Sequence, residues 1–349
     1  MNGEEMNGEE MGGEGMGSEE MGGEEIGSER MGDEGTGDLS MARIGDGELQ
    51  AAFVPGAGMV CCSLRHRGEE LLAQNAGLRE YAAHGHTMGI PLLYPWANRL
   101  AADAYTAAGH TVEIPRDPAL IARDGAGLPI HGAIGGRQAW ELDEPRREEA
   151  PRTLTARLTW SEDRPELWRV YPFRHDVLYE ARIDGDDCLS VTIAVEACGE
   201  DRVPVAFGLH PYLSPSGLPP GAPREDYAVE LPAMRHLLLD DRQIPAGAGQ
   251  VEPAREFELG EREFDDGFDR VADGATFAVR AGGRRIAVEF IEGYPCAQVY
   301  APRDGQFICF EPMTAPANAL RSGEGLRVLK PGQRHRATFA LRVRDLSHA

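Results

Sequence analysis

Four segments of the sequence carry side chains able to transfer protons or hold polar groups. Glu311 follows four apolar residues, so burial would raise the pKa of its carboxyl group unless a partner compensates. His131 and His210 lie beside a glycine and a proline, between apolar stretches. Asn98 and Arg99 end a run rich in proline and aromatic residues. Together these residue types indicate a site for general acid–base catalysis.

Other kinds of catalytic site are not indicated. The sequence has no serine in a Gly-x-Ser-x-Gly elbow and no cysteine beside a histidine motif, so covalent acyl transfer lacks its nucleophile. Neither 56–58 nor 135–136 has the glycine spacing of a nucleotide-binding loop. His84 and His86 resemble a pair of metal ligands, but no third ligand lies near them in the sequence. We therefore expect no metal site.

The composition argues against several classes of protein. The chain has 349 residues, with 35 Lys and Arg against 58 Asp and Glu, and its net charge of −23 disfavours binding to nucleic acid. It contains no run of about 18 apolar residues, so we expect no membrane span. Its six cysteines form no Cys-x-x-Cys pair, which suits neither a disulfide framework nor a zinc site. We expect a reducing, cytoplasmic environment.

The first forty residues differ from the rest of the chain. Residues 1–40 hold thirteen acidic residues and one basic residue in a glycine- and methionine-rich repeat of about five residues. A period of five matches neither helix nor strand, so no face can gather apolar side chains. We predict a disordered acidic tail over residues 1–40 and a single domain over residues 41–349.

Alternation of apolar and polar residues predicts that this domain is built mainly of strands. Leu154, Ala156, Leu158 and Trp160 alternate with polar residues over 153–160. The further predicted strands are 177–183, 189–195, 227–231, 276–280, 285–290, 297–300, 307–310 and 337–343. Residues 73–83 are a weak candidate for a helix. Many half-buried strands at short spacing indicate an all-β, antiparallel sandwich or barrel.

The motifs resemble those of a known family. GIPLLYPWANRL, PIHG, FGLHPY and FEPMTAP, in this order, are similar to segments of the aldose 1-epimerase (galactose mutarotase-like) family. Residues 240–247, 264–268 and 329–332 agree as well, and the resemblance runs from about Phe53 to Val343. It implies a large antiparallel β-supersandwich whose concave face binds a monosaccharide, with no metal and no organic cofactor.

The resemblance implies catalytic roles for three residues. Glu311 resembles the general base that takes the proton of the anomeric hydroxyl, and His210 resembles the general acid that protonates the ring oxygen. His131 resembles the second histidine, which donates a hydrogen bond near that oxygen. We expect Glu311 to be ionised while His210 is protonated, because opposite charges stabilise each other. We also expect the two side chains to face each other across the sugar, about a sugar's width apart.

The resemblance also implies residues that hold the sugar. Arg99 resembles the arginine that binds substrate hydroxyls, and Asn98 precedes it at the predicted cleft. Asp265, or its neighbour Asp266, resembles the aspartate that holds ring hydroxyls. The aromatic residues that could stack on an apolar sugar face are Trp96, Tyr212 and Trp140.

Some alternatives stay open. Ile130 stands where many family members have Asn, and this and the WANR form of the first motif leave the preferred sugar open. A hexose-6-phosphate 1-epimerase would share the fold, and Arg99 and Arg137 are candidates for its phosphate. A non-catalytic carbohydrate-binding module of the same fold is a further alternative, which the intact Glu311 disfavours. A lyase or glycosidase domain is weaker still, since no second catalytic carboxylate is evident. The chain is expected to be a monomer or homodimer.

Overall fold

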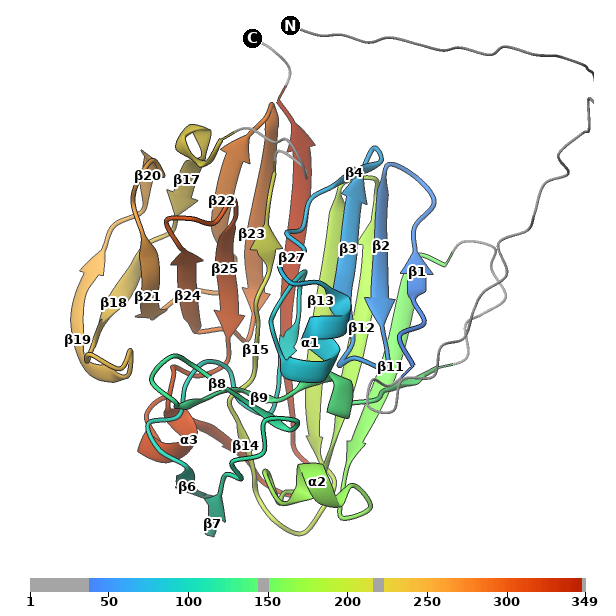
Figure 1. Cartoon of the computed structure of the whole chain (residues 1–349), viewed down its shortest axis with the longest axis vertical. Helices are drawn as coiled ribbons and strands as arrows, with labels where there is room; N and C mark the ends of the chain where they lie inside the picture. Colours follow the sequence, from blue (N-terminus) through green and yellow to red (C-terminus); the bar gives the residue numbers. More distant parts are fainter. Residues whose placement is uncertain (1–37, 144–150, 216–222, 347–349) are drawn as a thin grey trace, which may run out of the picture. The chain divides into compact units, whose positions relative to one another are not determined.

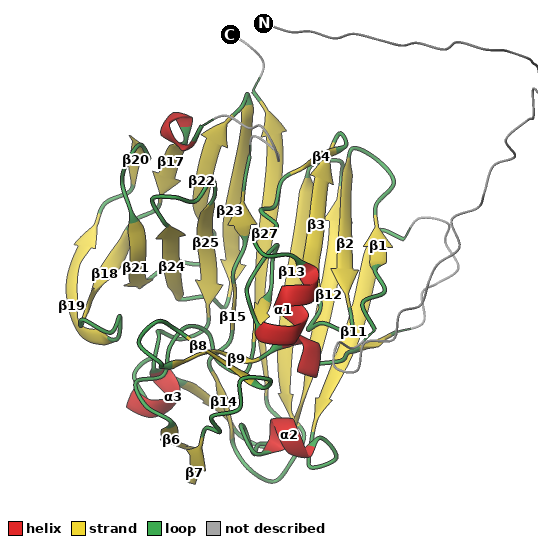
Figure 2. Ribbon diagram, in the orientation of Figure 1, coloured by secondary structure: helices red, strands yellow, loops and turns green. Residues whose placement is uncertain are grey.

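The structure is a computed structural model, which describes residues 38–143, 151–215 and 223–346. The predicted tail over residues 1–40 lies outside these residues, apart from Asp38–Ser40. Two large sheets and one smaller sheet contain most of the strand residues of the described chain (Figures 1 and 2). The predicted all-β, antiparallel architecture is confirmed.

The largest sheet has nine antiparallel strands. Their order is β10 (Glu141–Leu142), β11 (Thr153–Trp160), β12 (His175–Asp184), β13 (Cys188–Ala197), β27 (Arg334–Asp345), β23 (Arg284–Glu292), β22 (Ala275–Ala281), β17 (Ala228–Leu231) and β20 (Arg255–Glu258). Ala156, Tyr179, Ile193 and Ala337 form one buried row across four of these strands. Such rows explain why period-two alternation predicted these strands, since one face of each strand is buried.

The second sheet carries most of the polar residues of interest. Its order is β19 (Pro245–Glu252), β18 (Met234–Leu239), β21 (Phe264–Asp269), β24 (Cys296–Ala301), β25 (Ile308–Met313), β15 (Gly208–Leu209) and β5 (Leu92–Leu93), and β16 (Tyr212–Leu213) also pairs with β25. Glu311 lies within β25, directly across from Gln298 on β24. The predicted strand 307–310 was therefore too short at its C-terminal end.

A third, four-stranded sheet completes the core. It contains β1 (Ala42–Ile44), β2 (Leu49–Val54), β3 (Val60–His66) and β4 (Glu69–Glu70). The nine-stranded sheet packs on this sheet through Phe53 and Tyr179, whose ring centroids are 6.0 Å apart. It packs on the second sheet through Phe277 and Phe310, at 5.5 Å. Burying each such aromatic side chain contributes about 1.5–3 kcal/mol, so this shared core holds the functional strands rigidly in place.

Short helices and two-stranded sheets make up the remaining elements of the described residues. The helices are α1 (Leu78–His84), α2 (Pro165–Trp168) and α3 (Ala319–Ser322), with 3₁₀ turns at Gly135–Arg137 and Arg224–Asp226. The hairpins are β6 (Ala104–Ala107) with β7 (His110–Glu113), β8 (Ile121–Arg123) with β9 (Pro129–Ala133), and the pair β14 (Val203–Val205) with β26 (Arg327–Leu329). Within the described residues, no helix is long and apolar enough to cross a membrane.

The predicted helix over 73–83 is wrong at its beginning. Helix α1 starts at Leu78, because Asn75 and Gly77 have positive φ angles of 44° and 92° and cannot continue a right-handed helix. The helix ends at Gly85, again with a positive φ. Residues 73–77 form an irregular turn instead.

Candidate active site

Most of the predicted site residues meet around one cavity of about 190 Å³. Its lining includes Asn98, Arg99, His131, His210, Tyr212, Asp265 and Glu311. They come from the second sheet, from the segment that follows β5 and from hairpin β8–β9. The second sheet thus provides one wall of the cavity, and loops far away in the sequence provide the other.

Glu311 and His210 are in direct contact inside this cavity. Glu311 Oε1 and His210 Nε2 are 3.2 Å apart, and the residues are 2% and 5% exposed. The expectation that they lie a sugar's width apart is therefore wrong. The anomeric hydroxyl and the ring oxygen are bonded to the same carbon, so an acid and a base that lie close together can act on both. Among the described residues, Glu311 Oε2 and His210 Nδ1 have no hydrogen-bond partner.

Burial sets the protonation of this pair. Loss of water raises the pKa of Glu311 well above its usual value, and Asp265 adds to this effect. Burial also lowers the pKa of His210 well below its usual value, and His131 contributes in the same direction. The expected charged pair is thus disfavoured in the ligand-free cavity, where a protonated carboxyl beside a neutral imidazole costs less desolvation energy. The charged pair and the neutral pair contain the same number of protons and differ only in which residue carries one of them.

His131 is oriented by the backbone. The backbone N–H of Asn98 donates to His131 Nδ1 at 3.3 Å, which leaves Nε2 to carry the proton of the neutral ring. Burial, followed by Arg99, lowers the pKa of His131 to about 3. Gly132 is required beside it, because φ is +74° and a Cβ atom would lie 2.1 Å from the carbonyl oxygen of Tyr94. His131 is therefore a neutral hydrogen-bond donor at the edge of the cavity.

Arg99 and Asp265 belong to a polar network in the same cavity. Arg99 Nε donates to Asp124 at 2.7 Å, and its Nη2 lies 3.4 Å from Asp265 Oδ2. Gln298 Nε2 donates to Asp265 Oδ1 at 2.7 Å. Asp266 does not line the cavity, because adjacent residues of a strand point to opposite faces, and it contacts His236 at 3.0 Å. Of the two alternatives left open by the sequence, Asp265 is the one at the site.

The side chain of Asn98 also contacts Arg99. It is 4% exposed with a φ of 57°, and its side-chain oxygen accepts hydrogen bonds from the backbone N–H of Arg99 at 2.8 Å and from Arg99 Nη1 at 3.3 Å. Asn is one of the residues that tolerate this left-handed conformation. The Asn-Arg pair is therefore a local unit in which the first residue orients the second.

Comparison with known proteins agrees with this architecture. The family model for aldose 1-epimerase matches residues 42–342. The chain belongs to the aldose 1-epimerase family. Escherichia coli (strain K12) YihR is 25% identical over 289 residues, which cover 77% of this chain and 88% of YihR.

Two solved structures of other proteins have a fold similar to that of this chain. Slr1438 from Synechocystis sp. PCC 6803 has a TM-score of 0.69 at 20% identity and covers 90% of this chain and 98% of its own. A galactose mutarotase-like protein from Clostridium acetobutylicum has a TM-score of 0.70 at 15% identity, with 89% and 99% covered. At such identities the likeness concerns the fold, which is the galactose mutarotase-like sandwich predicted from the motifs.

Tyr212 lies at the site, whereas the two tryptophans do not. The ring of Tyr212 stacks on that of His210 with centroids 4.3 Å apart, and its hydroxyl contacts Thr87 and lies 3.3 Å from His210 Nε2. Trp96 is 1% exposed and packs in the main core, so its predicted contact with the substrate is wrong. Trp140 is in the same core. Both rings are held by apolar neighbours away from the cavity.

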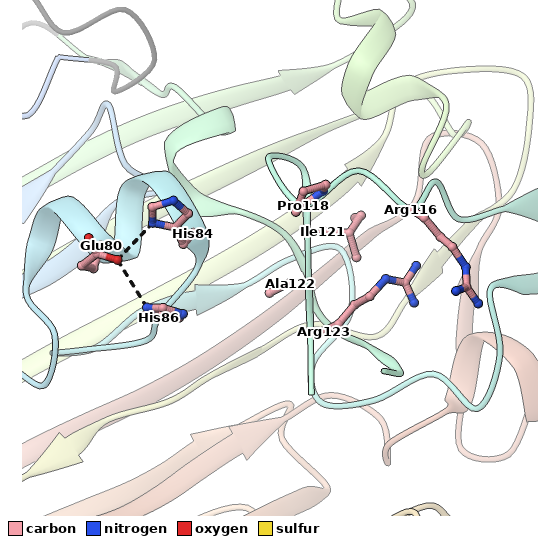
Figure 3. Close-up of a pocket in the computed structure, with 8 residues that line it drawn as sticks. All are labelled: Glu80, His84, His86, Arg116, Pro118, Ile121, Ala122 and Arg123. Atoms are coloured by element: carbon pink, nitrogen blue, oxygen red, sulfur yellow. Dashed lines mark hydrogen bonds and ion pairs between the residues drawn. The ribbon is translucent and has the colours of Figure 1, made fainter. Parts of the chain in front are cut away.

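The histidine doublet of this epimerase-family chain lies elsewhere, on the surface. His84 and His86 line a separate groove of about 590 Å³, and each Nδ1 faces Glu80 Oε2, at 3.0 and 3.5 Å (Figure 3). Across an apolar floor, Arg116 and Arg123 form the other wall. Among the described residues, no group of three or more His, Cys, Asp or Glu is arranged to hold a metal ion.

The sequence analysis missed four residues near the cavity. Thr87, Gln298 and Tyr300 line it, and Asp124 contacts Arg99. Gln298 was detectable as a polar residue within the apolar strand 297–300, where a buried amide requires a partner. Asp124 begins the turn sequence Asp-Gly-Ala-Gly, which indicates a tight turn but not its contact with an arginine.

Proposed function

We propose that the chain interconverts the α- and β-anomers of a free aldohexose, with Glu311 as general base and His210 as general acid. The observation that carries this proposal is the buried Glu311–His210 contact at 3.2 Å within a polar cavity. The cavity is smaller than the roughly 300–1,000 Å³ of sites for drug-sized ligands, which supports a monosaccharide as the occupant.

The proposed reaction opens and recloses the sugar ring. Glu311 takes the proton of the C1 hydroxyl while the bond between C1 and the ring oxygen breaks. The electron pair of that bond goes to the ring oxygen, which takes a proton from His210, and C1 becomes an aldehyde carbon. After rotation about the C1–C2 bond, the two residues exchange roles and the ring closes on the other face. Each positioned group contributes about 10²–10⁴-fold to such a rate.

The proton needed for this step is already present in the pair. The neutral carboxyl and neutral imidazole become carboxylate and imidazolium when one proton crosses the 3.2 Å contact. Substrate hydroxyls that donate to Glu311 and accept from His210 stabilise the charged forms in place of water. His131, which stays neutral, donates from Nε2 toward the ring oxygen. In the proposed reaction, a polyhydroxylated ligand therefore favours the charged, reactive form of the pair.

The charge of the cavity favours a free sugar over a sugar phosphate. Arg99 is the one lysine or arginine among the described residues that line it, and both Asp124 and Asp265 lie within 3.4 Å of that guanidinium. A phosphate would require converging positive groups. Arg137, the other candidate, lines a different depression and donates from Nε to the carbonyl of Ala119.

The same site disfavours a module that only binds sugar. Binding alone gains nothing from a carboxyl and an imidazole that are buried in contact with each other, and burying them costs free energy. The six cysteines are free thiols, which supports the proposed cytoplasmic location.

Polarimetry of freshly dissolved sugars tests the proposal. The relaxation of optical rotation is followed for α-D-glucose, α-D-galactose and glucose 6-phosphate, with and without the protein. We expect acceleration for at least one free hexose and a much smaller effect on the phosphate. Preference for the phosphate would favour the sugar-phosphate epimerase, and no acceleration of any sugar would favour the binding module.

A further inference from the structure

The turn between β8 and β9 has a partly buried acidic residue that the reaction scheme above does not use. One oxygen of Asp124 accepts the backbone N–H groups of Ala126 at 3.0 Å and Leu128 at 2.8 Å, which closes the turn. The other oxygen accepts Arg99 Nε at 2.7 Å. The side chain of Asp124 is 10% exposed, so water does not compete strongly for these contacts. The residue therefore joins a turn to a cavity-lining arginine.

Asp124 determines how the guanidinium of Arg99 is oriented. With Nε held by Asp124 and Nη1 by Asn98, the Nη2 edge faces Asp265 and the cavity. A guanidinium is planar, so fixing Nε fixes the direction of the remaining N–H groups. Charge-assisted hydrogen bonds of this kind are about twice as strong as neutral ones.

The same contact ties the hairpin that carries His131 to the Arg99 segment. Arg99 forms an isolated antiparallel β-bridge with Ile130 of β9, and the backbone N–H of His131 donates to the carbonyl of Asn98 at 3.0 Å. Asp124 adds a side-chain link at the turn end of this hairpin. Arg99 and His131 thus belong to one connected unit.

We propose that Asp124 is a positioning residue, which holds Arg99 in the orientation that binds substrate hydroxyls. The proposal rests on the proposed function, because it assigns hydroxyl binding to Arg99. Asp124 also compensates the charge of Arg99, so that the guanidinium binds neutral hydroxyl groups rather than an anion.

Asp124→Asn separates the two roles of this side chain. Asparagine keeps an oxygen that closes the turn, but its NH₂ group then faces Arg99 Nε–H, donor against donor. We expect KM to rise about ten- to a hundredfold, the effect of losing a hydrogen bond to a charged group, while kcat changes by less than about threefold. An unchanged KM, or a loss confined to kcat, would overturn the proposal.

A double-mutant cycle tests whether Asp124 acts through Arg99. In an Arg99→Ala background, Asp124→Asn should raise KM by less than about twofold, because the group it positions is gone. Additive effects of the two substitutions would mean that Asp124 acts only through the turn, and would overturn the proposal.

Asp117 provides a matched control in the same region. One of its oxygens accepts the backbone N–H of Ala119 at 3.1 Å, and the other lies 3.0 Å from Arg169 Nη2. This is the same combination of a turn contact and an arginine contact, but Arg169 does not line the catalytic cavity. Asp117→Asn should leave KM and kcat unchanged; a rise in KM like that of Asp124→Asn would overturn the proposal.

A measurement without substrate keeps the inference separate from the proposed function. In ¹⁵N NMR spectra, the Nε–H of Arg99, assigned by its loss in Arg99→Ala, should exchange slowly with water in the wild-type protein. It should exchange at least about tenfold faster in Asp124→Asn but not in Asp117→Asn. Equal exchange in all three proteins would overturn the positioning role. If the wild-type protein accelerates mutarotation of no sugar, the proposed function fails, while this comparison still decides whether Asp124 holds Arg99.

Discussion

Two clusters of histidine and glutamate in this protein differ in burial. The cavity contains His131, His210 and Glu311, and the residues of its central pair are 5% and 2% exposed. The surface groove contains Glu80, whose side chain is 47% exposed, with His84 and His86 at 59% and 64% (Figure 3). The surface contacts of 3.0 and 3.5 Å are about as short as the 3.2 Å contact in the cavity. Proximity therefore does not distinguish the two clusters.

The two clusters differ in the free energy needed to place a charge on their side chains. Water solvates the exposed side chains of the surface cluster, where an ion pair contributes about 0–1 kcal/mol. In the cavity, burial disfavours both the carboxylate of Glu311 and the imidazolium of His210, and the nearby Arg99 only partly offsets this for the carboxylate. Perturbed protonation in a cavity is typical of catalytic groups. This difference in burial supports placing the proposed chemistry in the buried cluster rather than in the exposed one.

Removing the proposed base should have the largest effect. Glu311→Gln keeps the shape of the side chain but cannot accept the hydroxyl proton, so we expect kcat/KM for mutarotation to fall about 10²–10⁴-fold by polarimetry. The variant should unfold at the same temperature or a higher one, because the buried carboxyl group is replaced by a neutral amide.

Glu80→Gln is the matched control, since it removes the carboxyl of the exposed cluster. It should leave both kcat/KM and the unfolding temperature unchanged. A loss of activity in Glu80→Gln comparable to that in Glu311→Gln, or near-normal turnover in the latter, would break the distinction between buried and exposed clusters.

Two neighbouring aspartates on β21 allow a smaller, sharper test. Asp265 contacts Arg99 and Gln298 in the cavity, whereas Asp266 contacts His236 on the other face of the strand. Asp265→Asn should raise KM about tenfold, because a charge-assisted contact becomes a neutral one. Asp266→Asn, the same change one residue away, should have no measurable effect on steady-state kinetics. Equal effects would show that the orientation of the strand does not decide which aspartate binds the sugar.

The sequence predicted seven strands of the nine-stranded sheet but no strand of the four-stranded sheet. Strands of the nine-stranded sheet alternate in period two because one face of each is buried, so 153–160 was predicted with its observed ends. Glu311 was identified by its apolar surroundings, which are a local feature. Its contact with His210, the burial of Trp96 and the choice between Asp265 and Asp266 depend on strand register and on loops distant in the sequence. Local patterns do not encode such contacts.

The two histidines at 84 and 86 show that nearness in the sequence does not by itself indicate a buried site. His84 and His86 are separated by one residue in the sequence and their ring centroids are 5.9 Å apart, yet they line a solvated groove. The residues of the cavity come from strands and loops far apart in the chain. The shared motifs suggested this set because they carry information about the folded arrangement.

A buried histidine outside the cavity provides a final test of how burial affects these side chains. His175 is fully buried outside the cavity, where Nδ1–H donates to the carbonyl of Phe173 at 2.6 Å and Nε2 contacts the hydroxyl of Tyr94. Burial lowers the pKa of His175 to about 4, only partly offset by the Phe173 carbonyl. As the pH falls below about 6.5, the unfolded chain binds a proton at this position that the folded chain does not, so stability is lost toward pH 4. From pH 7 to pH 5 this histidine should lower the free energy of unfolding by about 2 kcal/mol.

Urea denaturation at both pH values tests this expectation. His175→Gln should be less stable than the wild-type protein at pH 7, but should lose about 2 kcal/mol less on going to pH 5. His86→Gln, which removes an exposed imidazole, should behave as the wild type at both pH values. If His175→Gln loses as much stability as the wild type over this range, burial of the ring is not what makes the fold sensitive to acid.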